Sequence, residues 1–346
     1  MRAICFEGIE RVSLRDVAEP ALEDSTDAIV QVELAGLCGS DLHVYHGRET
    51  GLDSGTIMGH EMVGRVVAIG ADVGEVQIGD RVCAPFSSNC GQCFYCRAGL
   101  TSRCNKGQLF GWRQNGRGLQ GCQAEQVRVP FADGTLVKID PEISAVQGIL
   151  LGDNLSTGYF CSDLAEVNPA EVSAVVGCGT VGLLAILAAR QKNVSTIFAI
   201  DQIEHRLEFA ARLGAIPVTP AEAVSVISQA TEGRGADSVM ELVGLPAAQK
   251  LAFEILRPGG TMGVVGCHCT EHFAFSPVQA YDKNLTYRTG RCPARAYMDR
   301  LLPLLRNRTL DVEPFVTHTF SFAECEHAYE MFANRKDNCL KVAFVP

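Results

Sequence analysis

Four cysteines lie within one short stretch of this chain, CGQCFYCRAGLTSRC. They are Cys90, Cys93, Cys96 and Cys104, and the whole chain of 346 residues contains fifteen cysteines. Because two residues separate the first three in turn, their sulfurs can surround one point about 2.3 Å away. Zinc(II) favours four thiolates in a tetrahedron, which leaves no position open for chemistry. The spacing therefore predicts a structural zinc site in a surface lobe.

Disulfides, a redox dithiol and an iron–sulfur cluster compete with zinc at these cysteines. The N-terminal stretch MRAICFEGIERVSLRD lacks the apolar segment of a signal peptide, so we expect a cytoplasmic protein whose thiols stay reduced. Fifteen cysteines also cannot pair completely within one chain. A redox Cys-x-x-Cys motif would not need two further cysteines, whereas an iron–sulfur cluster also takes four and remains a rival.

Three further stretches carry possible metal ligands: AGLCGSDLHVYHG, IMGHEMVGRVVAIG and LLGDNLSTGY. They contain Cys38, His60, Glu61 and Asp153. None of the three is a short-range metal motif. By residue type alone, each histidine would more often be a satisfied surface or core residue, and Cys38 a small buried apolar side chain. These residues by themselves therefore leave their role open.

A glycine-rich turn follows an apolar strand predicted at 172–176, and an apolar helix rich in Ala and Leu follows the turn. Gly177, Gly179 and Gly182 fit the pattern GxGxxG. The first permits the tight turn, the second lets the backbone approach a pyrophosphate, and the third lets the helix lie close to the strand. The helix start, at Thr180 and Val181, offers N–H groups to an anion. The stretch therefore predicts a dinucleotide site.

The type of dinucleotide is predicted from the end of a second strand, STIFAID. This strand ends at Asp201, about twenty residues after Gly182. The carboxylate can accept both hydrogen bonds from the adenosine ribose and would repel a 2′-phosphate. The sequence therefore predicts NAD rather than NADP. Arg206 could accommodate that phosphate, but a solvated face of the next helix is the preferred interpretation.

Strand and helix signals go on alternating along the second half of the chain. Strands are predicted at 237–244, at 259–266 and at NLTYRTG. Alternation with short turns predicts an α/β fold with a parallel, doubly wound sheet. Ligands bind beyond the carboxyl ends of such strands, so Val243 and Gly266 are expected near the nicotinamide.

We expect two domains. Residues 1–150 together with 291–346 are predicted to form a β-rich catalytic domain, and residues 151–290 the dinucleotide-binding domain. Asp153 lies at the crossing between them, which suits a cleft there. The composition is globular, with 47% apolar and 20% charged residues, and no apolar run is long enough for a transmembrane helix. A net charge of −10 disfavours nucleic acid as a partner.

Four motifs in this order resemble the zinc-dependent medium-chain alcohol dehydrogenase family. They are CGSDLH at 38–43, GHEMVGRVVAIGADV with IGDRV at 59–82, the four-cysteine lobe, and VVGCGTVGLLA. The resemblance covers essentially the whole chain. It implies a Rossmann sheet for the dinucleotide and a β-rich, GroES-like catalytic domain.

The resemblance also implies a catalytic zinc bound by Cys38 and His60. Asp153 is implied as the third protein ligand, where many members of the family have cysteine. Glu61 resembles an adjacent acid that coordinates zinc directly or exchanges with water. Zinc accepts S, N and O ligands, so this set is chemically suitable. With carboxylates among the ligands, we expect this zinc to be lost more easily than the one in the lobe.

A proton path is implied as well. Ser40 resembles the hydroxyl that touches the alcohol oxygen, and His43 the distal base that passes the proton to solvent. Asp41 resembles the carboxylate that orients His60, which liganding histidines usually need. Without the resemblance, Ser40 and Asp41 would be interpreted as turn residues and His43 as an exposed side chain.

The expected function is reversible NAD-linked oxidation of primary or secondary alcohols to aldehydes or ketones. Polyol oxidation and glutathione-independent formaldehyde oxidation would use the same residues. A zinc-free quinone reductase would lack the Cys38/His60 pair and the cysteine lobe. A zinc-stapled binding protein is the non-enzyme alternative, and Ser40, His43 and Asp153 speak against it. The resemblance further implies a homodimer or homotetramer, in which the strand GTMGVVG could pair edge to edge.

Overall fold

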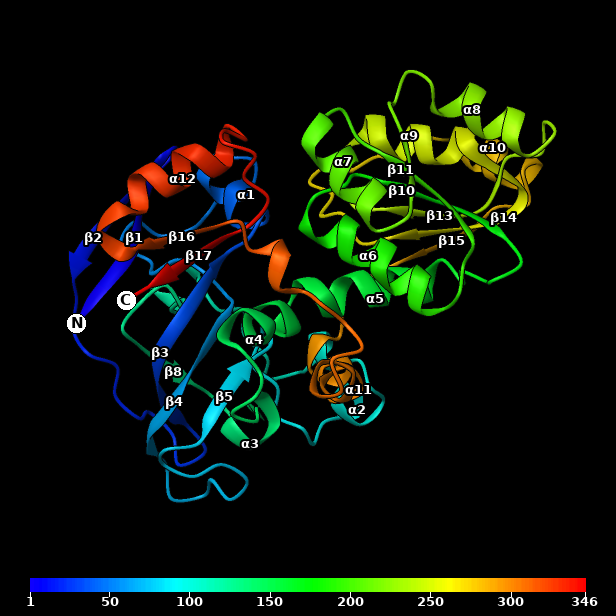
Figure 1. Ribbon diagram of the computed structural model, residues 1–346. Helices are drawn as coiled ribbons and strands as arrows, with labels where there is room; N and C mark the ends of the chain where they lie inside the picture. Colours follow the sequence, from blue (N-terminus) through cyan, green and yellow to red (C-terminus); the bar gives the residue numbers. More distant parts are fainter. The chain divides into compact units, whose positions relative to one another are not determined.

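The computed structural model describes residues 1–346 and divides them into two units (Figure 1). The first unit combines Met1–Ser156 with Pro293–Pro346, and the second unit spans Thr157–Cys292. No helix in the structure has both the length and the apolar character that crossing a membrane requires.

A seven-stranded sheet forms the centre of the first unit. Its order is β16-β17-β3-β4-β5-β9, with β8 also paired to β3, and most of its pairs are antiparallel. The strands are β3 (Ala28–Leu37), β4 (Met62–Ile69), β5 (Arg81–Ala84), β8 (Gln126–Val129), β9 (Val137–Lys138), β16 (His318–Ser321) and β17 (Val342–Val345). Apolar residues of β3 and β4 are buried in one core with Phe322, Tyr329 and Phe344 from the C-terminal segment. The two ends of the chain therefore share one core.

Short hairpins and helices surround this sheet. The hairpin strands are β1 (Arg2–Gly8), β2 (Arg11–Asp16), β6 (Trp112–Gln114) and β7 (Arg117–Leu119). The helices are α1 (Asp41–Tyr45), α2 (Phe94–Arg97), α3 (Ala132–Thr135), α4 (Ala145–Gly152), α11 (Ala294–Arg306) and α12 (Cys325–Ala333).

The helix α4 has well-defined ends. Ser144 and Gln147 form a capping box, each side chain accepting the other's backbone N–H at 3.0 Å. The helix ends at Gly152, where a Cβ atom would lie 2.2 Å from the carbonyl oxygen of Ala84 in β5. Asp153 then leaves the helical conformation, with φ −141° and ψ −76°. The cap and the close contact with β5 together fix the position of Asp153.

The second unit is built on a six-stranded sheet in which every pair is parallel. The order is β12-β11-β10-β13-β14-β15. The strands are β10 (Val172–Val176), β11 (Thr196–Ile200), β12 (Ile216–Val218), β13 (Ala236–Glu241), β14 (Leu256–Val264) and β15 (Thr286–Thr289). Its helices are α6 (Thr180–Gln191), α7 (Glu204–Arg212), α8 (Ala223–Ala230), α9 (Pro246–Ile255) and α10 (Pro277–Asp282), and α5 (Asn154–Leu164) begins in the first unit and ends in the second.

This sheet confirms the predicted α/β fold with a doubly wound parallel sheet. Figure 1 shows α8 and α9 over one face of the sheet and α6 over the other. The predicted strand 172–176 matches β10 at both ends. One detail of the prediction is wrong: GTMGVVG belongs to β14, which has β13 on one side and β15 on the other. It therefore has no open edge for a second copy, and β15 is the edge strand instead.

Candidate active site and metal centres

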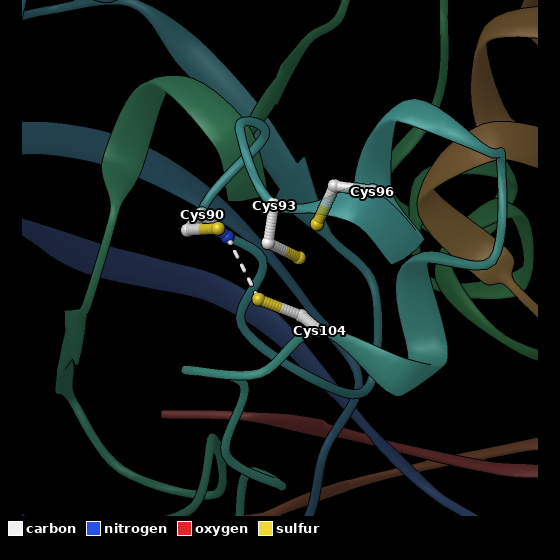
Figure 2. Close-up of side chains that lie close together, drawn as sticks. All are labelled: Cys90, Cys93, Cys96 and Cys104. Atoms are coloured by element: carbon white, nitrogen blue, oxygen red, sulfur yellow. Dashed lines mark hydrogen bonds between the residues drawn. The ribbon is translucent and has the colours of Figure 1, made fainter.

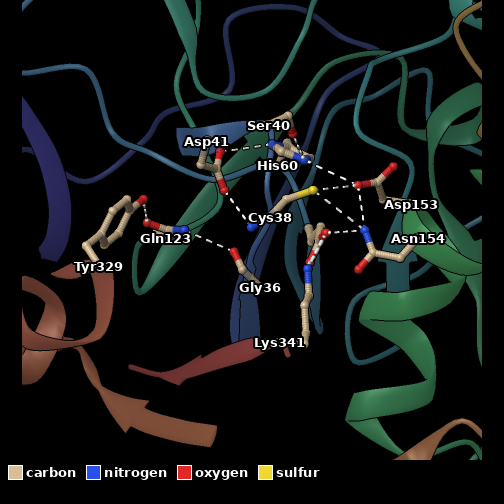
Figure 3. A network of polar contacts seen from close by, with 11 residues as sticks. Gly36, Cys38, Ser40, Asp41, His60, Gln123, Asp153, Asn154, Tyr329 and Lys341 are labelled. Atoms are coloured by element: carbon tan, nitrogen blue, oxygen red, sulfur yellow. Dashed lines mark hydrogen bonds and ion pairs between the residues drawn. The ribbon is translucent and has the colours of Figure 1, made fainter. Parts of the chain in front are cut away.

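Four possible metal ligands from separate segments meet inside the first unit (Figure 3). Cys38 follows β3, His60 and Glu61 precede β4, and Asp153 follows α4. The antiparallel pairing of β3 with β4 brings the first three together. The ligand atoms of all four residues lie within 4.8 Å of one another. The structure thus brings together the complete set of residues expected at the catalytic zinc.

Asp41 holds two members of this cluster. Its Oδ1 lies 3.2 Å from Nδ1 of His60, and its Oδ2 accepts the backbone N–H of Cys38 at 2.9 Å. With Nδ1 turned to Asp41, Nε2 of His60 faces the cluster and lies 3.4 Å from Oδ2 of Asp153. A carboxylate on the far nitrogen is the usual partner of a histidine that ligates a metal.

The pKa values in the cluster are strongly shifted. Burial alone would lower the pKa of His60, but Asp41 and Asp153 raise it well above its ordinary value. Burial raises the pKa of the Cys38 thiol, and the nearby Asp153 carboxylate raises it further. Asp153 is buried too, yet His60 and Lys341 lower its pKa. A divalent cation would displace the protons from Cys38 and His60, as ligand deprotonation requires. The donor set of sulfur, imidazole nitrogen and carboxylate oxygen fits zinc.

Two residues of this site were missed in the sequence, Lys341 and Asn154. Nζ of Lys341 donates to both carboxylate oxygens of Glu61, at 2.6 and 2.5 Å. Nδ2 of Asn154 donates to Glu61 at 3.0 Å and to Asp153 at 2.9 Å, and it lies 3.6 Å from Sγ of Cys38. The available signal was a lysine inside the apolar stretch CLKVAFVP, because a buried ammonium group requires a carboxylate partner.

The two residues expected in a proton path lie at the start of α1. Ser40 precedes this helix, and its Oγ is 3.3 Å from Nε2 of His60. His43 lies within α1 and donates its backbone N–H to the Ser40 carbonyl at 3.0 Å. Burial lowers the pKa of His43. Ser40 therefore touches the cluster, and His43 stands one helical turn further along the chain.

The four cysteines of the lobe also converge (Figure 2). The sulfurs of Cys90, Cys93, Cys96 and Cys104 lie within 4.8 Å of one another. The backbone N–H of Cys90 donates to Sγ of Cys104 at 3.3 Å. Backbone N–H groups of Cys96 and Asn105 lower the pKa of Cys93 to about 6, which favours a thiolate. Four sulfurs around one point fit a closed tetrahedral zinc site.

The glycine-rich turn lies at the carboxyl end of β10. Gly177 has φ +94°, which side chains other than glycine rarely adopt. A Cβ on Gly182 would lie 1.8 Å from the carbonyl oxygen of Gly177, so glycine is required for α6 to pack this closely. α6 begins at Thr180, followed by Val181, and Gly179 is its N-cap residue. This cradle fits the phosphates of a dinucleotide.

Asp201 and Arg206 follow the neighbouring strand β11. The Asp201 carboxylate accepts the backbone N–H of Cys178 at 2.7 Å and that of Ile203 at 3.0 Å. Arg206 lies 3.9 Å from the same carboxylate. Each carboxylate oxygen can accept a further hydrogen bond, so ribose hydroxyls remain possible partners.

The last two predicted cofactor residues follow neighbouring strands of the same sheet. Val243 comes after β13, and a Cβ on Gly177 would lie 2.5 Å from its side chain. Gly266 comes after β14, and its backbone N–H donates to the Glu241 carbonyl at 3.2 Å. The predicted cofactor residues thus gather at the carboxyl ends of four adjacent strands, where such sheets bind ligands.

Comparisons with known proteins agree with this geometry. The model of the alcohol dehydrogenase GroES-like domain matches residues 24–141, and that of the zinc-binding dehydrogenase matches residues 180–307. Zinc-type alcohol dehydrogenase B of Aspergillus flavus is 38% identical over 352 residues, covering 99% of this chain and 80% of that protein.

Solved structures agree as well. Alcohol dehydrogenase TADH from Thermus sp. ATN1 superposes with a TM-score of 0.95 at 41% identity, with 100% of both chains covered. Zinc dependent alcohol dehydrogenase 2 from Streptococcus pneumonia has a TM-score of 0.91 at 33% identity, covering 100% of this chain and 98% of that one. The resemblance seen in the sequence is therefore confirmed, and the chain belongs to the zinc-dependent medium-chain alcohol dehydrogenases, a family of oxidoreductases.

Proposed function

We propose that the protein catalyses the reversible NAD-linked oxidation of primary or secondary alcohols to aldehydes or ketones. The observation that carries this proposal is the convergence of Cys38, His60 and Asp153, with Nδ1 of His60 held by Asp41. We assign these three residues as ligands of a catalytic zinc, and the four cysteines of the lobe as ligands of a structural zinc. A zinc ion held by three protein ligands supplies Lewis acidity, which lowers the pKa of an oxygen beside it.

The residues around the cluster provide the path for the proton of the alcohol. The Ser40 hydroxyl lies beside Nε2 of His60, where it can accept a hydrogen bond from the substrate hydroxyl. Burial lowers the pKa of His43, so a proton that its imidazole takes up is readily released to solvent. Asp41 keeps the imidazole of His60 in one orientation throughout.

The second unit provides the cofactor site in this proposal. NAD supplies the hydride acceptor. The turn at Gly177, Gly179 and Gly182 and the start of α6 bind the pyrophosphate, and Asp201 binds the adenosine ribose. The preference for NAD rests on the negative charge of Asp201, which repels a 2′-phosphate. We also propose that the protein acts as a homodimer or homotetramer.

The central test is the Cys38→Ser variant. We expect zinc content to fall from about two to about one per chain and alcohol oxidation to be lost, because one ligand of an open zinc site is removed. NADH binding, measured by fluorescence, should remain within about twofold, since the cofactor residues are untouched. Cys5→Ala is the matched control, because Cys5 is buried in β1 of the same unit, away from both clusters.

Two further outcomes decide the proposal. Full turnover by a Cys38→Ser protein that has lost one zinc would overturn the role of the metal. Wild-type enzyme tested on primary, secondary and polyol substrates, with NAD and NADP in parallel, would define the substrate class. Exclusive turnover of polyols or formaldehyde, or faster turnover with NADP, would replace the corresponding part of the proposal.

A further inference from the structure

Glu61 and Lys341 form an ion pair that is completely buried. Their side chains are 0% and 1% exposed, and Nζ of Lys341 lies within 2.6 Å of both carboxylate oxygens. A buried pair of this kind stabilises a fold poorly, because removing both charges from water costs about as much as their attraction returns. The position of the pair beside Cys38 therefore indicates a role at the metal site.

The strands place Lys341 next to the ligands. β17 pairs antiparallel with β3, with Val342 opposite Leu37. One step further along this register, Lys341 comes opposite Cys38. The backbone of Glu61 is fixed in turn, since its carbonyl accepts the N–H of Gly36 at 3.1 Å. The carboxylate of Glu61 can therefore move from Lys341 to a metal ion only by a change in the conformation of its side chain.

The surroundings of Glu61 are shaped to hold its carboxylate against Lys341. A Cβ on Gly36 would lie 1.8 Å from Oε2 of Glu61, so glycine makes the room that the carboxylate occupies. Asn154 donates to Oε1 at 3.0 Å from another side. The same amide of Asn154 contacts Asp153 and Cys38, which links the position of Glu61 to two of the assigned ligands.

We propose that Lys341 is a positioning residue that keeps Glu61 out of the coordination sphere of the catalytic metal. The inference rests on the proposed function, because it assumes an ion at Cys38, His60 and Asp153. Glu61 lies close enough to these ligands to become a fourth one, but only by giving up hydrogen bonds to Lys341. Lys341 thus leaves one position of the metal open for substrate, as catalytic zinc sites require.

The test uses the full-length protein loaded with cobalt(II), whose visible absorption reports the coordination of the metal. Subtracting the spectrum of Cys38→Ser isolates the catalytic site from the four-cysteine lobe. Imidazole is the probe of the open position. In Lys341→Met we expect Glu61 to ligate the ion, to change the cobalt spectrum and to weaken imidazole binding about tenfold or more.

Two further variants separate positioning from a structural role. Lys341→Arg keeps a cation against Glu61 and should retain the wild-type spectrum and imidazole affinity. Lys341→Met combined with Glu61→Gln removes both charges, and imidazole affinity should return to within about threefold of wild type. A wild-type spectrum and affinity in Lys341→Met, or no recovery in the double variant, would overturn the proposal.

The experiment remains decisive if Lys341→Met does not fold. Glu61→Gln alone should then bind imidazole within about twofold of wild type, because Glu61 is not a ligand there. Much tighter binding would mean that Glu61 already occupies the open position, contrary to the inference. Failure of the proposed function is distinguishable, since the wild-type spectrum would then contain no component that depends on Cys38.

Discussion

The absence of a side chain at Gly36 makes room for the carboxylate of Glu61 at this site. This carboxylate occupies the space that a Cβ on Gly36 would fill. The carbonyl of Gly36 also accepts from Nε2 of Gln123 at 3.0 Å, and Oε1 of Gln123 accepts the hydroxyl of the buried Tyr329 at 2.8 Å (Figure 3). The packing around one glycine therefore connects the assigned metal ligands to the C-terminal helix α12.

Replacing Gly36 with alanine should consequently destabilise the first unit. Forcing an atom into this packed space should lower the free energy of unfolding by about 2 kcal/mol, and it should also weaken metal binding at Cys38. Urea denaturation and metal analysis measure the two effects. Gly74→Ala is the control, because the nearest atom to its Cβ is 3.9 Å away, and its stability should stay equal or rise by up to about 1 kcal/mol. Equal stability of Gly36→Ala and wild type would contradict the packing argument.

At the level of elements, one buried carboxylate links three adjacent strands of the parallel sheet, β10, β13 and β14. Asp237 lies in β13, at the centre of the sheet. It accepts the N–H of Val172 in β10 at 2.9 Å and Nε of Arg257 in β14 at 2.6 Å, and it also pairs with Arg234. Burial alone would raise the pKa of Asp237, but these donors lower it below the ordinary value.

The stability contributed by Asp237 should therefore depend on pH. A carboxylate with a lowered pKa stabilises the fold above its unfolded pKa of about 3.9, and this stabilisation is lost as the pH falls through the folded value. At pH 7 the free energy of unfolding of Asp237→Asn should be about 2 kcal/mol lower than that of wild type, and this difference should shrink below pH 4. Urea titrations at several pH values measure it, with the exposed Asp282→Asn as control. If the difference in unfolding free energy between wild type and Asp237→Asn grows as the pH falls, the conclusion that Asp237 stabilises the fold as a carboxylate with a lowered pKa is refuted.

The stability of the four-cysteine lobe should also depend on a few side chains. Its only regular structure is α2 and a 3₁₀ turn at Thr101–Arg103, and neither Cys93 nor Cys96 is fully buried. Such a segment has little apolar contact to hold it, so a bound zinc would provide much of its stability.

A variant that lacks one cysteine of the lobe should distinguish the proposed structural zinc from the proposed catalytic zinc. Cys104→Ser should retain about one zinc per chain and lose thermal stability, because a structural zinc contributes directly to folding. The cobalt spectrum that depends on Cys38 should persist in this variant. Two zinc ions per chain in both Cys104→Ser and Cys38→Ser would show that the sites are assigned wrongly.

At the scale of the whole molecule, β15 leaves one edge of the parallel sheet open. Edge strands offer unpaired backbone groups to a second chain. The segment before β15 exposes apolar side chains, with Phe273 59%, Val278 76% and Tyr281 86% exposed. Large exposed apolar side chains close to an open edge are typical of an interface, and a second copy of the same chain is the occupant we propose.

Charge at this surface should therefore break the proposed oligomer. Val278→Asp combined with Tyr281→Glu should shift the mass measured by light scattering toward that of one chain, 37.2 kDa. Ile78→Asp is the control, because Ile78 is 65% exposed but belongs to the first unit. A wild-type protein that is already monomeric, or a double variant of unchanged mass, would refute the proposal.

Features that depend on neighbours along the chain could be predicted from the amino-acid sequence. The lobe, the strand at 172–176 and the glycine turn after it were predictable, because the cysteine spacing, the apolar run and the glycine pattern are each contained in one short segment. The hydrogen bonds of this strand come instead from β11 and β13, which lie far along the chain. Cys38, His60 and Asp153 could be grouped only through family resemblance, since their spacing is that of no local motif. Tertiary structure alone revealed that Lys341 pairs with Glu61, 280 residues away, and that Asn154 joins them. Such contacts arise from how strands pair and helices end, and no local pattern of residues specifies them.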